Sequence, residues 1–185
     1  MNYKKLYTGK GNGGTTDIYL GDRVLKTDQR ISVVGEIDFF HASLGLCHSH
    51  LKKAPIDQQI KKEFLNIQFC LTKVMGEVVS DPELLSIQKI KKVVNKNDIS
   101  VLKAFYDFLA GELEGKTQKG LAMYGERGAA SAQFDFATTI CRKCELELWR
   151  LRGDGTNKYF ESGDALEYFN LLSKVLYLAA RLKEI

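Results

Sequence analysis

The most concentrated group of residues with chemical potential is the glycine-rich stretch from Tyr7 to Lys26, YTGKGNGGTTDIYLGDRVLK. Its glycines crowd together at Gly9, Gly11, Gly13 and Gly14. Glycine lets a backbone approach a ligand closely and adopt positive φ, and successive free N–H groups form a concavity that suits anions. Lys10, Arg23 and Lys26 add positive charge. We therefore expect a polyphosphate-binding segment, and the alternative is a flexible arm with a glycine turn.

Two familiar glycine motifs do not fit this stretch. Gly9, Gly11 and Gly14 spell G-x-G-x-x-G, but the dinucleotide fingerprint requires a buried strand before it and a helix after it. Only MNYKKLYT precedes the glycines, and IYLGDRVL after them is not a clear helix. The P-loop requires Gly-Lys followed by Ser or Thr, whereas the last glycine here runs into two threonines.

A second group is a polar stripe on a predicted helix, at Thr138, Arg142, Glu145 and Trp149. The planar guanidinium of Arg142 matches phosphate oxygens, and Glu145, three residues on, can pair with it and orient it. The alternative is a solvated surface ion pair, which contributes little. On the last predicted helix, Asn170 adjoins the apolar stripe, where a buried Asn could hydrogen-bond a nucleobase or cap a neighbouring group.

The cysteines and histidines give weaker signals. Cys141 and Cys144 form C-x-x-C, but no second motif accompanies them, so we interpret them as small apolar residues within a helix. His41, Cys47, His48 and His50 form a cluster that could bind a metal, a hypothesis the spacing leaves open.

The composition limits the classes of function. The 185 residues suggest a single domain, with residues 1–30 as the N-terminal segment that carries the glycine-rich stretch and residues 31–185 as a helical bundle. The net charge of +4 is spread among interspersed acidic residues, which favours a small anionic ligand over nucleic acid. The sequence has no apolar run long enough for a membrane span and no secretory signal, so we expect a cytoplasmic protein with reduced thiols.

Apolar residues recur at helical spacing along most of the chain, and no long stretch alternates with the period of a strand. We expect four or five long helices, over about residues 31–51, 60–78, 99–113, 134–151 and 162–180. Ser162 or Asp164 should cap the last one, and Gly153 should end the one before it. Residues 80–98 should form a loop with some helix over residues 83–94, and residues 111–127 a loop. The predicted fold class is an all-α bundle.

Taken in order, these motifs resemble the PduO-type ATP:cob(I)alamin (corrinoid) adenosyltransferases. The resemblance rests on Tyr7, Thr8, Gly11, Gly14, Thr16, Gly21, Arg23 and Lys26, then Gly35 to Asp38, Ser43 to Gly45, Ile67, Gln68, Leu71, Gly76, Glu77, Ala137 to Leu146, Phe169 to Ser173, and Arg181. It implies a bundle of about five helices that assembles as a homotrimer, with ATP sites between subunits.

The activity implied is transfer of the 5′-deoxyadenosyl group of ATP to the reduced cobalt of a corrinoid, with Mg²⁺ bound and triphosphate leaving. By this resemblance the triphosphate would be held by Thr8, Gly9, Lys10, Gly11, Thr16, Asp17 and Lys26. The helical side of the site would consist of Arg142, Lys143, Cys144, Glu145 and Leu146, and Asn170 would touch the nucleotide. Asp38, Arg142 and Glu145 are the predicted catalytic residues.

The chain departs from the family pattern mainly on the corrinoid side. Thr138 replaces an arginine that pairs with the aspartate matching Asp38 and contacts ATP, and Lys174 or Lys143 would have to compensate. The family's L-P-G-G stretch has no clear counterpart, and Met123 or Tyr124 would take the place of a nearby aromatic residue. The alternative function is therefore a non-catalytic member that binds ATP or corrinoid as a sensor or carrier.

Overall fold

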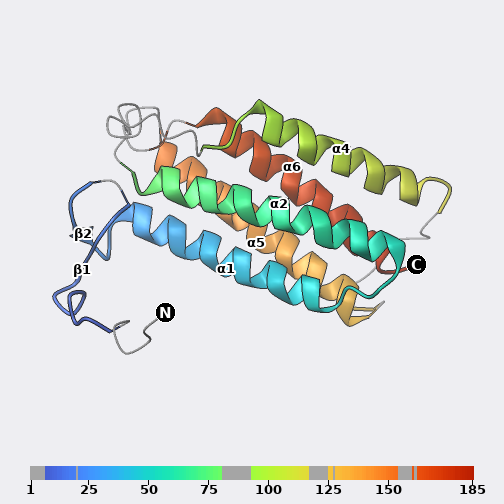
Figure 1. Ribbon diagram of the computed structural model, residues 1–185, viewed down its shortest axis with the longest axis horizontal. Helices are drawn as coiled ribbons and strands as arrows, with labels where there is room; N and C mark the ends of the chain where they lie inside the picture. Colours follow the sequence, from blue (N-terminus) through green and yellow to red (C-terminus); the bar gives the residue numbers. More distant parts are fainter. Residues whose placement is uncertain are drawn as a thin grey trace.

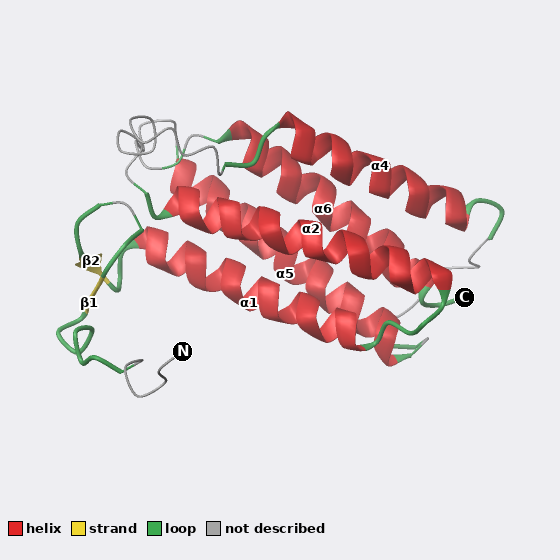
Figure 2. Ribbon diagram, in the orientation of Figure 1, coloured by secondary structure: helices red, strands yellow, loops and turns green. Residues whose placement is uncertain are grey.

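The computed structural model describes residues 7–19, 21–80, 93–116, 125–126, 128–153, 160 and 162–185. Over these residues the chain forms five long helices that lie side by side (Figures 1 and 2): α1 (Gln29–Ser49), α2 (Pro55–Val78), α4 (Lys96–Leu113), α5 (Ala129–Arg152) and α6 (Gly163–Leu182). The predicted all-α bundle is confirmed. The helix expected over about residues 83–94 falls mostly outside the described residues, as do Met123 and Tyr124.

The helix boundaries follow from local side-chain chemistry. Asp28 caps α1 by accepting the backbone N–H of Arg30, and Asn95 and Asp98 form a reciprocal capping box at the start of α4. Ser162 caps α6 through the N–H of Ala165, which selects Ser162 from the two predicted caps. Gly153 ends α5 with a φ of 61°, a left-handed conformation that favours glycine, as predicted.

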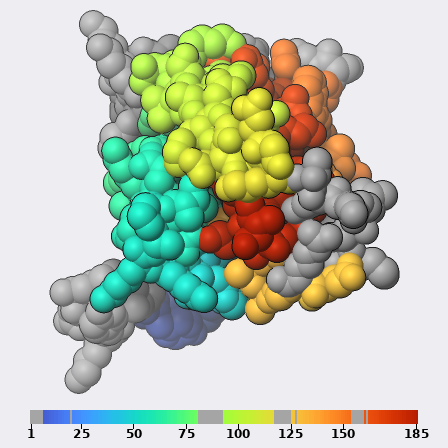
Figure 3. All heavy atoms as spheres, turned by 90° about the vertical axis from the view of Figure 1, so that its right-hand side faces the viewer, coloured from blue at the N-terminus to red at the C-terminus, as the bar shows by residue number. Residues whose placement is uncertain are grey.

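The core consists of the apolar residues whose spacing predicted the helices. Aromatic rings tie distant helices together: Phe40 of α1 lies 6.1 Å from Phe169 of α6, and Phe64 of α2 lies 5.7 Å from Phe134 of α5. α5 packs against both α1 and α6, and α6 also packs against α4, whereas α2 and α4 meet only loosely. In the space-filling view along the bundle, α2, α4 and the end of α6 lie next to one another (Figure 3).

The N-terminal segment forms a small antiparallel hairpin of β1 (Thr15–Thr16) and β2 (Val24–Leu25), with Thr15 opposite Leu25 and Thr16 opposite Val24. The hairpin lies beyond the start of α1, away from the body of the bundle (Figure 1), and forms no extensive interface with a helix. None of the described helices is both long enough and apolar enough to span a membrane.

Candidate functional site

The glycine-rich loop is folded by its own backbone. The N–H of Asn12 donates to the carbonyl of Gly9 at 3.0 Å, and the N–H of Gly14 donates to the carbonyl of Gly11 at 3.2 Å. Gly9 and Gly14 have φ angles of 70° and 78°, which other residues rarely adopt. The N–H of Lys26 then donates to the carbonyl of Gly14, so the loop is anchored on β2.

Arg23 fastens this loop from the side. Its Nη1 forms an ion pair with Asp17 at 2.6 Å, and its Nη2 donates to the carbonyls of Lys10 and Thr15 at 2.9 and 3.1 Å. The charges of Arg23 and Asp17 therefore neutralise each other, although Asp17 was predicted to hold triphosphate. The sequence did not predict that Arg23 holds the loop, because the spacing of residues does not show which backbone carbonyls a guanidinium group reaches.

Lys26 brings its charge to the glycine backbone. A methyl group added at Gly11 would lie 3.0 Å from Lys26 Nζ, so the ammonium group lies over the loop. Lys10 and Lys26 are exposed and form no ion pair with any described residue. Thr8 is also exposed, and its Oγ1 accepts the N–H of Lys10 at 3.4 Å, while Thr16 is half-buried in β1. Two available cations thus border a folded loop that faces solvent, an arrangement suited to an anion.

The residues of the polar stripe on α5 differ in their exposure to solvent. Thr138 is buried, and its hydroxyl donates to the carbonyl of Phe134 at 2.8 Å, whereas Arg142 is exposed and Glu145 is half-buried. Within the described residues Arg142 and Glu145 make no ion pair with each other or with another side chain, so the pairing suggested by their spacing is absent. The guanidinium of Arg142 is therefore available to a ligand.

The adjacent residues Lys143 and Cys144 face α1 instead. Lys143 Nζ lies 2.8 Å from Glu36 Oε1, and this hydrogen bond raises the pKa of Lys143. The thiol of Cys144 donates to the carbonyl of Glu36 at 3.3 Å, and burial raises its pKa to about 12. Both side chains therefore serve the contact between α1 and α5. Leu146, next along the helix, is exposed.

Asn170 is exposed on α6, next to the apolar stripe. It follows Phe169, whose ring is buried and whose carbonyl accepts the thiol of Cys141 at 3.6 Å. This bond joins the helical turn that carries Arg142 to the turn that carries Asn170. Arg142, Glu145 and Asn170 therefore lie along the same contact between α5 and α6.

Asp38 lies exposed on α1 and has no ion-pair partner among the described residues. The glycine-rich loop lies beyond the start of α1, away from the body of the bundle (Figure 1), and its hairpin forms no extensive contact with α5. A single chain thus presents the predicted site residues as two separate surfaces.

Cys141 and Cys144 are buried packing residues of α5, as predicted. All four cysteines are free and buried, and burial raises the pKa of Cys47 to about 12. Cys47 donates its thiol to the carbonyl of Gln133 at 3.4 Å, which removes it from the suggested metal cluster. His48 and His50 are exposed, and nowhere in the described part of the chain do three His, Cys, Asp or Glu side chains gather as a metal site.

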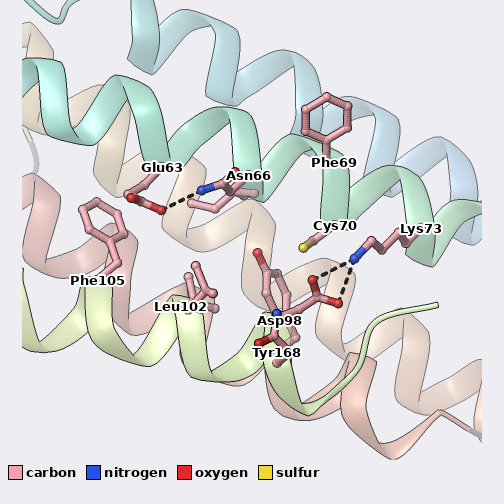
Figure 4. Close-up of a pocket in the computed structure, with 12 residues that line it drawn as sticks. Glu63, Asn66, Phe69, Cys70, Lys73, Asp98, Leu102, Phe105 and Tyr168 are labelled. Carbon is pink, nitrogen blue, oxygen red and sulfur yellow. Dashed lines mark hydrogen bonds and ion pairs between the residues drawn. The ribbon is translucent and has the colours of Figure 1, made fainter. Parts of the chain in front are cut away.

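A pocket of about 280 Å³ lies between α2 and α4, with Tyr168 of α6 at its floor (Figure 4). Lys73 and Asp98 close one end through contacts of 2.7 and 2.8 Å. None of the predicted site residues lines this pocket. The pocket exists because α2 and α4 make only a loose contact.

Comparisons with known proteins identify the family of the chain. Residues 6–183 match the family model described as cobalamin adenosyltransferase. A corrinoid adenosyltransferase of Citrobacter freundii is 28% identical over 180 residues, which cover 97% of this chain and 95% of that protein. The corrinoid adenosyltransferase PduO of Salmonella typhimurium is 30% identical over 97% of this chain, which spans about half of its length (49%).

Solved structures show the same fold. Two are variants of a PduO-type adenosyltransferase from Lactobacillus reuteri, each 21% identical over 96% of this chain. The variant complexed with cobalamin and ATP superimposes with a TM-score of 0.78 over 92% of its chain. The variant complexed with ATP gives a TM-score of 0.79 over 93%. Together with the match to the family model over nearly all of its length, this places the chain in the cobalamin adenosyltransferase family.

Proposed function

We propose that this chain transfers the 5′-deoxyadenosyl group of ATP to the reduced cobalt of cobalamin or a related corrinoid and releases triphosphate. The observation that carries the proposal is the match to the adenosyltransferase family over residues 6–183. It is supported by an exposed glycine-rich loop bordered by two lysines and by Arg142 of α5, which forms no ion pair with a described residue.

The reaction explains why the chain needs no catalytic triad. Cobalt(I) is itself the nucleophile: it attacks C5′ of ATP, the Co–C bond forms, and the C5′–O bond breaks as triphosphate leaves with its electron pair. The chain must align cobalt with C5′ and stabilise the charge that grows on the triphosphate. Both are tasks of position and electrostatics.

The loop is suited to the triphosphate. The backbone around Gly9 and Gly11, held by Arg23, would supply N–H donors together with the ammonium groups of Lys10 and Lys26. Because Arg23 already fixes the loop, ATP binding would require little further ordering. Thr8 and Thr16 would add hydroxyl groups, and Asp17 would act through its ion pair with Arg23.

The glycine-rich loop would form one wall of the ATP site, and the surface between α5 and α6 would form the other wall. Arg142 would bind phosphate oxygens with its planar fork, and Glu145 would orient the arginine when ATP is bound. Asn170, exposed on the neighbouring helix, would contact the nucleoside. In this proposal Lys143 and Cys144 hold α5 on α1 beneath the site.

The two walls would belong to different subunits of a homotrimer. Besides their separation within one chain, an exposed apolar surface on α1 and α5 supports this assembly. Phe39 is 52% exposed and Phe136 47% exposed, and their rings meet edge to face at 6.2 Å. Leu46 and Trp149 are also exposed on these two helices. Surfaces of this kind mark protein interfaces, and Asp38 would then face the neighbouring subunit.

Mg²⁺ would enter as part of the MgATP substrate. The described residues offer separate carboxylates rather than a group of three ligands, and Mg²⁺ commonly binds through one or two carboxylates together with substrate phosphates. Glu145 is the carboxylate nearest to Arg142 along α5 and would be the ligand. The buried free cysteines favour a reducing compartment such as the cytoplasm.

The decisive experiment combines purified protein, MgATP and chemically reduced cobalamin. The expected result is a light-sensitive product with a Co–C bond, formed at a rate that saturates with ATP. ATP binding without any product above the protein-free control would instead favour the sensor or carrier role. If neither binding nor product is observed, both functions are excluded.

A further inference from the structure

The contact between α5 and α6 has a register that two side-chain pairs define. Asp135 Oδ2 lies 2.6 Å from Arg181 Nη2, and Ser131 Oγ donates to Glu184 Oε1 at 3.0 Å. The second pair joins an earlier residue of α5 to a residue just beyond the C-terminal end of α6, so the helices run antiparallel. A step forward along α5 therefore corresponds to a step backward along α6.

Two helical turns along this contact, the same register brings two cations together. A step of seven residues nearly completes two turns of an α-helix. Seven residues after Asp135 is Arg142, and seven residues before Arg181 is Lys174. The thiol of Cys141, next to Arg142, donates to the carbonyl of Phe169, five residues before Lys174, so α5 and α6 remain in contact along this stretch. Both Arg142 and Lys174 also act on the pKa of the Cys141 thiol, which burial raises well above its usual range.

At the first position Arg181 is paired with the carboxylates of Asp135 and Glu184, but the second position is positively charged. Arg142 and Lys174 are both exposed, and neither forms an ion pair with a described residue. Glu145, three residues after Arg142, is the carboxylate that accompanies them, so these three residues carry a net positive charge. Two neighbouring cations repel each other unless an anion binds between them. Lys143 differs because Glu36 already neutralises it.

We propose that Lys174 is a second cation of the nucleotide site and binds the triphosphate together with Arg142. This inference rests on the proposed function. Asn170 lies one helical turn before Lys174, and residues four apart share a face of a helix. The same face of α6 would thus contact the nucleoside through Asn170 and the phosphates through Lys174.

Calorimetry with three probes tests this assignment. The dissociation constants of MgATP, inorganic tripolyphosphate and adenosine are measured for the wild type, Lys174→Ala and Lys174→Arg. Lys62→Ala is the matched control, since Lys62 is an exposed lysine on α2 without an ion pair among the described residues. Loss of one charged contact should weaken MgATP and tripolyphosphate binding about ten-fold. Adenosine binding and the melting temperature should stay unchanged, Lys174→Arg should retain most of the affinity, and Lys62→Ala should match the wild type.

The results that would contradict the role of Lys174 differ from those that would contradict the proposed function. If Lys174→Ala binds tripolyphosphate as tightly as the wild type does, the role of Lys174 is refuted and the proposed function stands. An equal loss for all three probes, or a lowered melting temperature, would show a structural role and also refute it. Wild-type protein that binds neither MgATP nor tripolyphosphate would refute both proposals.

Discussion

Asp135 and Arg181 form an ion pair of 2.6 Å that joins the start of α5 to the end of α6, with side chains only 5% and 10% exposed. Arg181 also lies 2.8 Å from Glu184, so one guanidinium serves two carboxylates. Burial raises the pKa of Asp135 even though Arg181 acts to lower it. The pair therefore costs desolvation and fixes the register between the two helices more than it adds net stability.

Removing Arg181 should destabilise the fold, because Asp135 and Glu184 would lose the guanidinium that bridges them. We expect Arg181→Ala to lower the free energy of unfolding by about 3–5 kcal/mol, as measured by urea denaturation. The control is Lys103→Ala, which removes an exposed ion pair with Asp107 and should change stability by less than about 1 kcal/mol. Equal effects of the two variants would contradict this account.

Arg142 should matter for turnover and not for folding, since it is exposed and unpaired in the described structure. We expect Arg142→Ala to lower kcat/KM for ATP about 100-fold, by analogy with the loss of one donor to developing charge. Its melting temperature should equal that of the wild type. Arg150→Ala is the matched control: Arg150 is exposed on the same helix and pairs with Glu147, so its loss should leave the rate unchanged. A similar rate for both variants would exclude Arg142 from the site.

Sequence patterns predicted the helices because burial imposes a strict spacing. The run from Phe134 to Leu151 repeats every three or four residues, and α5 buries these residues at nearly every step. Capping signals such as Ser162 and Gly153 fixed the ends, since each satisfies local backbone geometry.

The same patterns could not assign neighbours to the polar residues. Lys143 and Glu36 are 107 positions apart, and only the packing of α5 on α1 brings them together. The sequence left the burial of Asn170 open, because it lies one residue outside the apolar stripe, where a small change in helix phase decides exposure, and the side chain is exposed. Likewise, the charge of Arg23 suggested a ligand contact, whereas the folded loop uses it internally.

The left-handed glycines should control ATP binding. Gly14 has a φ of 78°, so Gly14→Ala should strain the loop by about 1 kcal/mol or more and displace the backbone that Lys26 binds. We expect the KM for ATP to rise several-fold with little change in melting temperature. Gly13→Ala is the control, because Gly13 does not have a positive φ and an added methyl group there meets open space. If both alanines raise KM equally, loop flexibility and not the conformation of Gly14 sets the affinity.

Glu77 should make stability depend on pH. Burial raises its pKa from 4.5 to about 7, although a hydrogen bond with Ser162 opposes the shift, and its Oε2 has no hydrogen-bond partner among the described residues. Because the folded state keeps this proton to higher pH than the unfolded chain does, the stabilisation is complete below about pH 4.5 and is lost as the pH rises through about 7.

Replacing this carboxyl should remove that pH dependence. Glu77→Gln should be more stable than the wild type at pH 8.5, by at most about 3 kcal/mol, with the advantage vanishing near pH 5. Melting temperatures across this range provide the measurement. Glu112→Gln, an exposed site on α4, should follow the wild type throughout. A constant difference between Glu77→Gln and the wild type at every pH would show that Glu77 does not titrate in this range.

The exposed aromatic pair on α1 and α5 should hold the subunits together. Phe136→Asp would place a charge where two aromatic rings meet, and buried charges at an interface are costly. We expect light scattering to show trimers for the wild type and monomers for this variant, with loss of adenosyl transfer because the two walls separate. Phe69→Asp is the control, since Phe69 is exposed on α2, outside the surface formed by α1 and α5. Trimers of Phe136→Asp would exclude this surface as the interface.

Mixed trimers would test whether each site takes its walls from two subunits. Lys26→Ala damages the loop and Arg142→Ala damages α5, so each variant alone should be nearly inactive. When the two are unfolded and refolded together at equal amounts, about a quarter of the interfaces would pair an intact loop with an intact α5 surface. Adenosyl transfer should then recover to about a quarter of the wild-type rate. If refolded mixtures remain as inactive as the separate variants, each site is built within one chain.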